Sequence, residues 1–231
     1  MANKKIRLGV NIDHIAFIKK SRDTLYPNLL DAVRIAEHAG ADLITIHLRE
    51  DRRHIQDKDA LDIRQYAKVL NFEMANTVEM IQFAITLKPD FCCIVPEKRE
   101  EKTTEGGLSL SSYTDKQIAS LKTTITDFRN HKIKTSLFID PDNRSIDIAK
   151  DVGADLVELH TGKYANQFNT INEFESLEEI STASRYAHSK DLLVNVGHGL
   201  NYENLSEICK LDHINEAVSY THLTLPTTEA V

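Results

Sequence analysis

The sequence predicts an α/β fold, a closed (β/α)8 barrel, from three observations. Short apolar runs alternate strictly with longer amphipathic runs, which indicates a parallel sheet with right-handed crossovers. Each strand–helix unit takes about 30 residues, and the 231 residues of the chain come near the ~250 of a TIM barrel. A doubly wound open sheet is the alternative. However, the first apolar run continues into GVNIDH, not into the GxGxxG of a dinucleotide fold.

Seven strands are expected, each a short run that is mostly apolar. They occupy residues 6–12, 42–48, 71–75, 90–95, 133–139, 155–160 and 192–197. Helical periodicity fills the stretches between and after them, at residues 28–39, 57–69, 77–87, 114–130, 143–152, 172–189 and 202–210. In LLDAVRIAEHAGAD the apolar residues share one helix face, and Gly40 stands where that helix ends. KDVGAD at residues 150–155 repeats this order of a helix end, a glycine and the next strand.

Composition excludes several other classes of protein. A net charge of −7 and a pI near 5.8 argue against a broad basic surface for nucleic acid. No apolar run approaches the ~20 residues of a membrane span, and MANKKIRLGVNID lacks the ~7–15-residue apolar core of a signal peptide. The three cysteines form neither a zinc pattern nor a disulfide framework. We therefore expect a cytoplasmic protein in which Cys92 and Cys93 are buried packing residues.

Polar side chains gather where the expected strands end, which in a barrel is the rim that builds an active site. They are Asn11, Asp13, His14, His47, Arg49, His54, Glu73, Glu97, Lys98, Asp140, Glu158, His160, Asn195 and His198. Glu73 is the most unusual, because NFEMA is otherwise largely apolar and a buried carboxylate is costly unless paired or protonated. Burial raises a carboxyl pKa toward the range in which a general base works best. Glu158 has two interpretations: a catalytic group, or the partner of a basic side chain in the barrel mouth.

Basic side chains form a second group in the loops after the strands. They are Arg22, Arg49, Arg52, Arg53, Lys98 and Arg99. KTTEGGLS at residues 102–109 adds hydroxyls and a glycine pair. Guanidinium groups and loop amides bind phosphate, so we expect a phosphorylated small substrate. The alternative is a self-neutralising loop, because LREDRR alternates in sign, but such a loop does not need His47 and His54 on its two sides.

A metal site is a further alternative. Its ligands would be His14, His47, Glu73, His160 and His198. However, the first strand carries no HxH, the chain has no aspartate-rich cluster, and the neighbouring arginines would repel a cation. The sequence therefore favours a site without metal.

Several strings together resemble one known family. They are GVNIDHIA, TIHLREDRRHI, NFEMA, VPEKRE, TTEGGL, SLFID, ELHTG and GHGLNY. Over about residues 6–216 the chain resembles the pyridoxine 5′-phosphate synthases, which close the pyridine ring in one route to vitamin B6. The resemblance implies condensation of 1-deoxy-D-xylulose 5-phosphate with 3-amino-2-oxopropyl phosphate, giving pyridoxine 5′-phosphate, phosphate and water. It also implies no metal or organic cofactor, and a homo-oligomer, an octamer in the family.

The same resemblance implies residue roles. By matching motifs, His47 and Glu73 take the positions of proton acceptors, His198 that of a proton donor, and Glu158 that of a transition-state stabiliser. Further matching positions hold the pentulose phosphate: Asp13, His14, Arg49, His54 and Thr103. Those for the aminoketone phosphate are Asn11, Arg22 and Gly199. No role is implied for Arg52 and Arg53, for which salt bridges are expected.

The resemblance fails at the end of the chain, which reads AVSYTHLTLPTTEAV. A family-like eighth strand with a Gly–His pair and a closing helix are expected there, and Pro226 would interrupt a helix. We therefore expect a single barrel domain over residues 1–216, a truncated or replaced eighth unit, open strand edges, and a tail of foreign sequence over residues 217–231. Two alternatives follow for function. One is a non-catalytic or impaired phosphate-binding barrel. The other is a phosphosugar isomerase or aldolase, although the only strand lysine, Lys134, would lie at the wrong barrel end.

Overall fold

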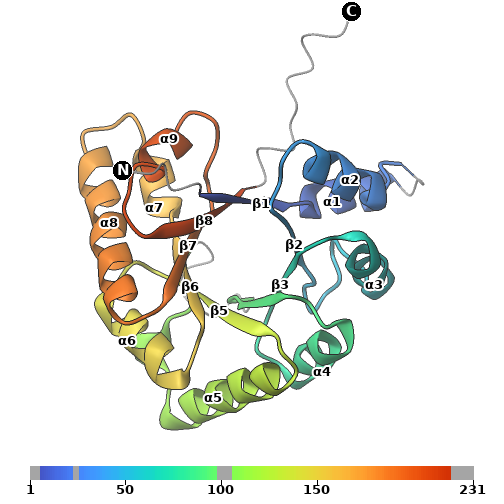
Figure 1. The fold of residues 1–231 in the computed structure, drawn as a ribbon, viewed down its shortest axis with the longest axis horizontal. Coiled ribbons are helices and arrows are strands. Elements are labelled where there is room, and N and C mark those ends of the chain that lie inside the picture. Colours follow the sequence, from blue (N-terminus) through green and yellow to red (C-terminus); the bar gives the residue numbers. More distant parts are fainter. Residues whose placement is uncertain (1–5, 23–25, 98–105, 220–231) are drawn as a thin grey trace, which may run out of the picture.

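Eight parallel strands form a closed barrel in the order β1 to β8 in a computed structural model of the chain (Figure 1). The structure describes residues 6–22, 26–97 and 106–219. The strands are β1 (Arg7–Asn11), β2 (Leu43–His47), β3 (Leu70–Met74), β4 (Phe91–Ile94), β5 (Lys134–Ile139), β6 (Leu156–His160), β7 (Leu193–Gly197) and β8 (Ile214–Ser219). The predicted (β/α)8 barrel is thus confirmed.

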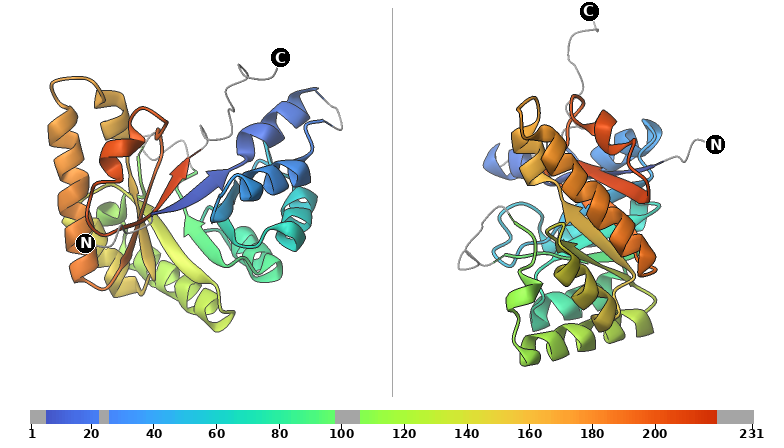
Figure 2. Two further views of the ribbon diagram at one scale, coloured as in Figure 1. Left: turned by 45° about the horizontal axis from the view of Figure 1, so that its top comes forward. Right: turned by 90° about the vertical axis from the view of Figure 1, so that its left-hand side faces the viewer.

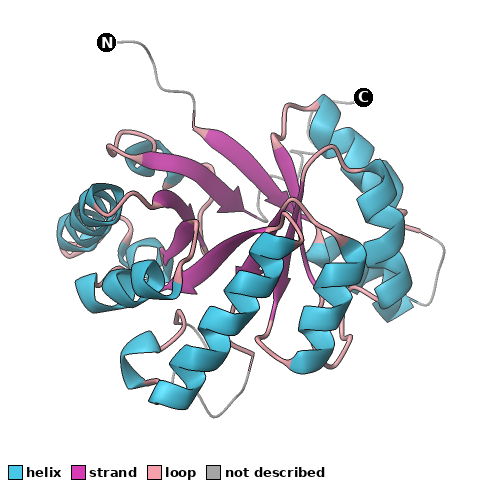
Figure 3. Cartoon of the chain, turned by 60° about the horizontal axis from the view of Figure 1, so that its bottom comes forward, coloured by secondary structure: helices cyan, strands magenta, loops and turns pink. Residues whose placement is uncertain are grey.

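Helices surround the strands on the outside, as Figure 1 and Figure 3 show. They are α1 (Asp13–Arg22), α2 (Leu29–His38), α3 (Asp57–Tyr66), α4 (Val78–Leu87), α5 (Asp115–Asn130), α6 (Asn143–Val152), α7 (Gly162–Gln167), α8 (Glu173–Ser189) and α9 (Leu205–Ile208), with a 3-10 turn at Leu110–Ser112. Helices α1 and α7 are additions to the prediction, and α9 is shorter than the helix expected at 202–210. None of the helices in the described part of the chain is both long and apolar enough to cross a membrane.

The eighth strand corrects one expectation. The sequence analysis expected open strand edges, but β8 pairs with β7 and with β1, where Gly9 lies opposite Val218 (Figure 2). The expectation of open strand edges is therefore wrong, and residues 217–219 belong to the barrel. The physical reason is that INEAVS is apolar enough to be buried on both faces, with Ile214, Ala217 and Val218 all in the interior. The rest of the expected foreign tail, residues 220–231, lies outside the described residues.

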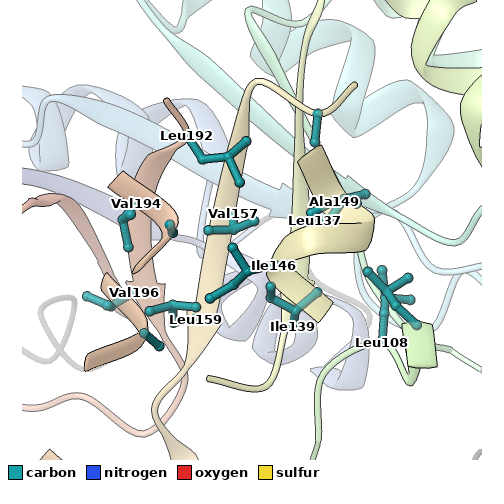
Figure 4. Close-up of a cluster of buried hydrophobic side chains, with 14 of the residues drawn as sticks. Leu108, Leu137, Ile139, Ile146, Ala149, Val157, Leu159, Leu192, Val194 and Val196 are labelled. Carbon is teal, nitrogen blue, oxygen red and sulfur yellow. The ribbon is translucent and has the colours of Figure 1, made fainter. Parts of the chain in front are cut away.

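Apolar side chains pack between the barrel and its helices in two clusters. One joins the first four strands to α2, α3 and α4. The other joins the later strands to α5, α6 and α8, and Figure 4 shows Ile139, Ile146 and Val157 within it. Each buried Leu, Ile or Phe contributes about 1.5–3 kcal/mol relative to an exposed position. Cys92 and Cys93 are buried and unbonded to one another, as predicted for packing residues.

The inside of the barrel, in contrast, is largely polar. Its buried side chains include Asn11, Thr45, Asn71, Glu73, Ser136, Glu158, Asn195 and Glu216. The thiol of Cys93 on β4 lies 3.9 Å from Oε2 of Glu158 on β6. Because β4 and β6 are not neighbours in the sheet, this contact spans the interior. The ionisable members of this polar interior extend from the barrel centre to the rim at the carboxyl ends of the strands.

At the amino-terminal end of the barrel, aspartate side chains hydrogen-bond neighbouring strands in pairs. Asp42, Asp90 and Asp155 each stand just before an even-numbered strand. Their carboxylates accept hydrogen bonds from the backbone N–H groups of Leu8, Leu70 and Thr135 at 2.9–3.0 Å. In each pair the aspartate N–H also donates to the carbonyl of that residue. These paired bonds fix the register of β1 with β2, β3 with β4, and β5 with β6.

Removing one such aspartate is expected to destabilise the fold measurably. Asp155→Ala leaves the part-buried N–H of Thr135 without its charged acceptor, and such hydrogen bonds contribute about 1.5–3 kcal/mol. We expect the free energy of unfolding, measured by urea denaturation, to fall by that amount. Asp151→Ala, at an exposed position of α6, is the matched control and is expected to change it by less than about 0.5 kcal/mol. An equal loss in both variants would contradict the role given to Asp155.

Candidate active site

A cavity opens at the carboxyl ends of the strands, where the sequence predicted the site. Its walls include His47, Glu73, Pro96, Phe138, Glu158, His160, His198 and Val218. A second cavity adjoins it beside α7, and Gly106, His160 and His198 line both. Three of the four predicted acid–base residues come from different strands, and His198 directly follows β7. The barrel therefore brings all four to one cavity.

His47, the last residue of β2, is held from several sides. Its backbone N–H donates to Oδ1 of Asp13 at 2.9 Å. Its Nε2 lies 2.8 Å from Oε1 of Glu97, and its Nδ1 lies 3.9 Å from Oε2 of Glu73. The imidazole is thus placed between two carboxyl groups, one at the rim and one inside the barrel. Such a position suits proton transfer, because either ring nitrogen has an oxygen near it.

Glu73 has the environment that the sequence predicted. It is 8% exposed on β3, and burial raises its pKa well above the ordinary value, with the charges of Glu158 and Asp13 acting in the same direction. Glu158 on β6 has its pKa raised to about 8, first by burial and then by the charge of Glu216. Among the described residues, no lysine or arginine forms an ion pair with Glu158, so its second interpretation finds no support there; its side chain instead lies near the Cys93 thiol. Two carboxyl groups with raised pKa values can hold and release protons near neutral pH.

Asn11 and Asp13 form a hydrogen-bonded pair at the start of α1. The Asn11 Nδ2 donates to Asp13 at 3.1 Å, and the Asp13 N–H donates back to Asn11 at 2.8 Å. Burial raises the pKa of Asp13, and the nearby His47 partly offsets this. His14, the next residue, is exposed. Asp13 also holds the His47 backbone, so this pair positions the acid–base group as well as facing the rim.

The stretch TIHLREDRRHI, whose charges the sequence singled out, divides into two uses. Arg52 pairs with Asp57 and Glu79, and Arg53 pairs with Asp51, so the expected salt bridges are confirmed. Arg49 and His54 each have a buried nitrogen, Nε and Nδ1 respectively, without a hydrogen-bond partner among the described residues, although Nε of Arg49 lies 3.5 Å from Oδ1 of Asp51 in an ion pair. Burial, then the charges of Arg53 and Arg49, lower the pKa of His54. These two side chains remain available to bind an anion.

A tight turn follows β7 and places His198 and Gly199. Both have positive φ, 83° and 75°, and a Cβ on Gly199 would lie only 2.6 Å from that of Ala165. The hydroxyl of Thr161 donates to the carbonyls of Gly197 and His198 at 2.6 Å each. Glycine is therefore favoured at 199 by its left-handed conformation, and the close approach of Ala165 on α7 leaves no room for a side chain.

Four side chains that the sequence analysis singled out cannot be placed. Thr103 lies outside the described residues, as do Lys98 and Arg99. Arg22 is the last residue of α1, and its side chain lies outside the described part. For the metal alternative, Asp13, His47 and Glu73 offer ligand atoms within 4.8 Å of one another. The other three ligands that the sequence suggested, His14, His160 and His198, are not part of this group among the described residues.

Glu97 also belongs to this site, although the family resemblance implied no role for it. Besides its contact with His47, its Oε2 accepts the N–H of Glu50 at 2.9 Å. Burial works to raise its pKa, but the hydrogen bonds from His47 and Glu50 outweigh burial and lower it. Its place after the fourth strand was visible in the sequence. Its pairing with His47, 50 positions earlier in the chain, was not visible there.

Comparison with known proteins identifies the family. Residues 8–223 match the family described as pyridoxal phosphate biosynthesis protein PdxJ. The chain belongs to the PdxJ family. One relative, the pyridoxine 5′-phosphate synthase of Thioalkalivibrio sulfidiphilus, is 49% identical over 212 residues, or 91% of this chain and 85% of that protein. The pyridoxine 5′-phosphate synthase of Coxiella burnetii is 47% identical, over 91% of this chain and 87% of that protein.

Solved structures show the fold that this PdxJ family member shares with other enzymes. The YdjI aldolase from Escherichia coli K12 superposes with a TM-score of 0.59 at 12% identity, covering 94% of this chain and 76% of that one. Phosphoribosylanthranilate isomerase from Thermotoga maritima, as monomers, gives 0.56 at 12% identity, covering 94% and 87%. At such low identity, these two likenesses concern the barrel alone and carry no argument about chemistry.

Proposed function

We propose that this chain is a pyridoxine 5′-phosphate synthase. It condenses 1-deoxy-D-xylulose 5-phosphate with 3-amino-2-oxopropyl phosphate to give pyridoxine 5′-phosphate, phosphate and water. Membership of the PdxJ family and relatives of that name at 47–49% identity support the proposal. The observation that carries it is the buried Glu73 beside His47 at the cavity wall. Closing a ring from an amine and a ketone needs such groups to move several protons.

The four acid–base residues receive distinct roles in this proposal. His47 and Glu73 accept protons, and their positions on neighbouring strands support a shared proton path. His198 donates a proton to the leaving group from the rim. Glu158, whose pKa of about 8 keeps it largely protonated near neutral pH, donates a hydrogen bond to oxygen charge that develops in the transition state. Each proton transfer of this kind contributes about 10²–10⁴-fold.

The remaining predicted residues hold the two phosphorylated substrates. The pentulose phosphate is assigned to Asp13, His14, Arg49, His54 and Thr103. The aminoketone phosphate is assigned to Asn11, Arg22 and Gly199. The buried nitrogens of Arg49 and His54 that lack hydrogen bonds support the first assignment, because a buried polar atom without a hydrogen bond is costly until a ligand supplies one; Arg49 also forms an ion pair with Asp51. Holding two polyanions in one orientation lowers the entropic barrier to their meeting.

The proposal includes the location and assembly that the sequence suggested. We place the enzyme in the cytoplasm as a homo-oligomer, with no nucleic acid or membrane partner. The acidic net charge of −7 supports the first exclusion. Light scattering after size-exclusion chromatography measures the assembly, and a monomer at micromolar concentration would overturn that part alone.

Product formation tests the proposed function. Purified full-length chain is mixed with both phosphorylated substrates, and pyridoxine 5′-phosphate is followed by chromatography and fluorescence. We expect product without added metal or nicotinamide cofactor, and undiminished product after chelator treatment. Turnover that vanishes with chelator would favour a metal site at Asp13, His47 and Glu73. Absence of product in the wild-type chain and in a chain with a family-like C-terminus would overturn the proposal.

Glu97→Gln is expected to lower kcat about tenfold while leaving both KM values unchanged. The amide keeps the shape of the side chain but loses the charge that orients His47, and outer partners of this kind contribute about 10- to 100-fold. Steady-state kinetics on both substrates measures this. Glu50→Gln, an exposed neighbour, is the control. An unchanged kcat in Glu97→Gln would show that His47 needs no such partner.

A further inference from the structure

A second histidine–carboxylate pair faces His47 across the cavity. His160 ends β6, four strands around the barrel from His47, and is 7% exposed. Its Nδ1 lies 3.3 Å from Oδ1 of Asp140, which directly follows β5. The N–H of Gly107 donates to the same carboxylate oxygen at 3.0 Å. The pair is therefore fixed by two strand ends and by the segment that returns to the barrel at Gly107.

Asp140 sets which nitrogen of His160 carries the proton. The hydrogen bond from His160, followed by the N–H of Gly107, lowers the pKa of Asp140, so this carboxyl group is ionised at neutral pH. An ionised carboxylate only accepts hydrogen bonds. The proton between the two groups therefore belongs to Nδ1 of His160. In the neutral ring, Nε2 is then an unprotonated acceptor.

That Nε2 is buried and has no hydrogen-bond partner among the described residues. Leaving a buried polar atom unpaired costs about 1–3 kcal/mol, a cost that a bound molecule would remove. The neighbouring Gly162 leaves space beside this atom. A Cβ at Gly162 would lie 2.6 Å from Nε2 and 3.1 Å from Cδ2 of His198, so a larger residue would fill this space. His160 lines both cavities.

The ring of His198 lies beside that of His160 in the cavity. The two imidazole rings have centroids 4.8 Å apart at an angle of 57°, and the ring of Phe138 holds the other side of His160 edge-on at 5.3 Å. We propose that His160, held by Asp140, is a further acid–base residue of this site that reloads His198 with a proton. The inference rests on the proposed function, in which His198 donates a proton.

The proton balance is simple. Nε2 of His160 takes a proton that the substrate releases: one bond to hydrogen breaks on the substrate and one forms at Nε2. The imidazolium is stabilised by the charge of Asp140. The same proton then passes from Nε2 through a hydroxyl of the bound substrate to the His198 ring after His198 has protonated the leaving group, because Nε2 has no direct hydrogen bond to His198. No electrons are gained or lost, and His160 ends in its starting form.

The first test measures the tautomer directly in the full-length wild-type chain labelled with 15N-histidine. Long-range 1H–15N spectra distinguish a protonated from an unprotonated ring nitrogen, and the His160 signals are assigned by their loss in His160→Asn. At pH values where the ring is neutral, we expect hydrogen on Nδ1 and a free Nε2. Hydrogen on Nε2 would overturn the proposal. This reading does not depend on turnover or on the stability of a variant other than the one used for assignment.

Kinetics of two variants supply the second test. His160→Asn keeps an amide N–H toward Asp140 but has no group at Nε2, and we expect kcat to fall about 100-fold with both KM values within twofold. Asp140→Asn keeps the shape and removes the charge. We expect kcat to fall and, in the 15N-histidine spectra, the His160 hydrogen to be no longer confined to Nδ1, because an amide at position 140 can donate to that nitrogen as well as accept from it.

The outcomes separate this inference from the function on which it rests. A wild-type chain without product overturns the proposed function. An active wild type with full kcat in His160→Asn overturns only the role of His160. A lower kcat with an unchanged His160 tautomer in Asp140→Asn would mean that the pair merely supports the fold, which also overturns the role. Thermal melting of each variant shows whether folding is intact, and His188→Asn, a histidine on α8, is the matched control.

Discussion

Glu73→Gln is expected to abolish nearly all turnover while leaving the barrel folded. The amide cannot accept and release a proton, so kcat should fall by about 10²–10⁴-fold. Burial and the charges of neighbouring acidic groups raise the pKa of Glu73, so its charged form is less favourable inside the barrel than in water, and an uncharged amide of the same shape removes that cost. Stability at neutral pH should therefore be retained or slightly improved. The measurements are single-turnover product formation and thermal melting on the same preparation.

A matched substitution separates chemistry from charge. Glu175→Gln removes one negative charge at an exposed position of α8 and should leave both kcat and melting temperature unchanged. Glu73→Gln with wild-type kcat would remove Glu73 from the mechanism. Loss of activity together with a melting temperature far below that of the wild type would assign Glu73 to the fold and not to the reaction.

The second large effect concerns stability as a function of pH. Burial raises the pKa of Glu158 to about 8 and that of Glu216 to about 7, each above an ordinary value of 4.5. The folded chain therefore binds these protons more tightly than the unfolded chain does. The stabilisation is fully present below about pH 4.5 and is lost as pH rises through 7 and 8. One unit of pKa difference is worth about 1.4 kcal/mol, so the free energy of unfolding should fall by several kcal/mol across this window.

Carboxyl groups with lowered pKa values, such as Asp140 and Glu97, act in the opposite direction, but below their ordinary pKa values. They do not cancel the effect between pH 5 and 8. Urea denaturation at several pH values measures the slope. Glu216→Gln should make it shallower, raising stability relative to the wild type at pH 8 and not at pH 5. Glu203→Gln, at an exposed position, should leave the slope unchanged, and a wild type that becomes more stable between pH 5 and 8 would contradict the prediction.

Much of this protein could be read from local pattern. Strand periodicity and helix endings such as Gly40 and Gly153 are properties of a few neighbouring residues. Seven strand–helix units in alternation leave few topologies, and the barrel then places every strand end on one rim. Glu73 stood out because a carboxylate in an apolar strand has a physical cost wherever that strand packs. The sequence by itself thus determined the barrel, its active rim and the chemistry of its residues.

Tertiary structure alone decided which of these residues act on one another. The closure of the barrel by β8 depended on pairing with β1, some 200 positions away in the chain. The pairs His47–Glu97 and His160–Asp140 join different strands, and the hydrogen-bonding partner of a histidine fixes its tautomer. The pKa of Glu158 follows from burial and from Glu216 across the barrel. Distance and dielectric environment set these properties, and both exist only once the strands have closed around a common interior.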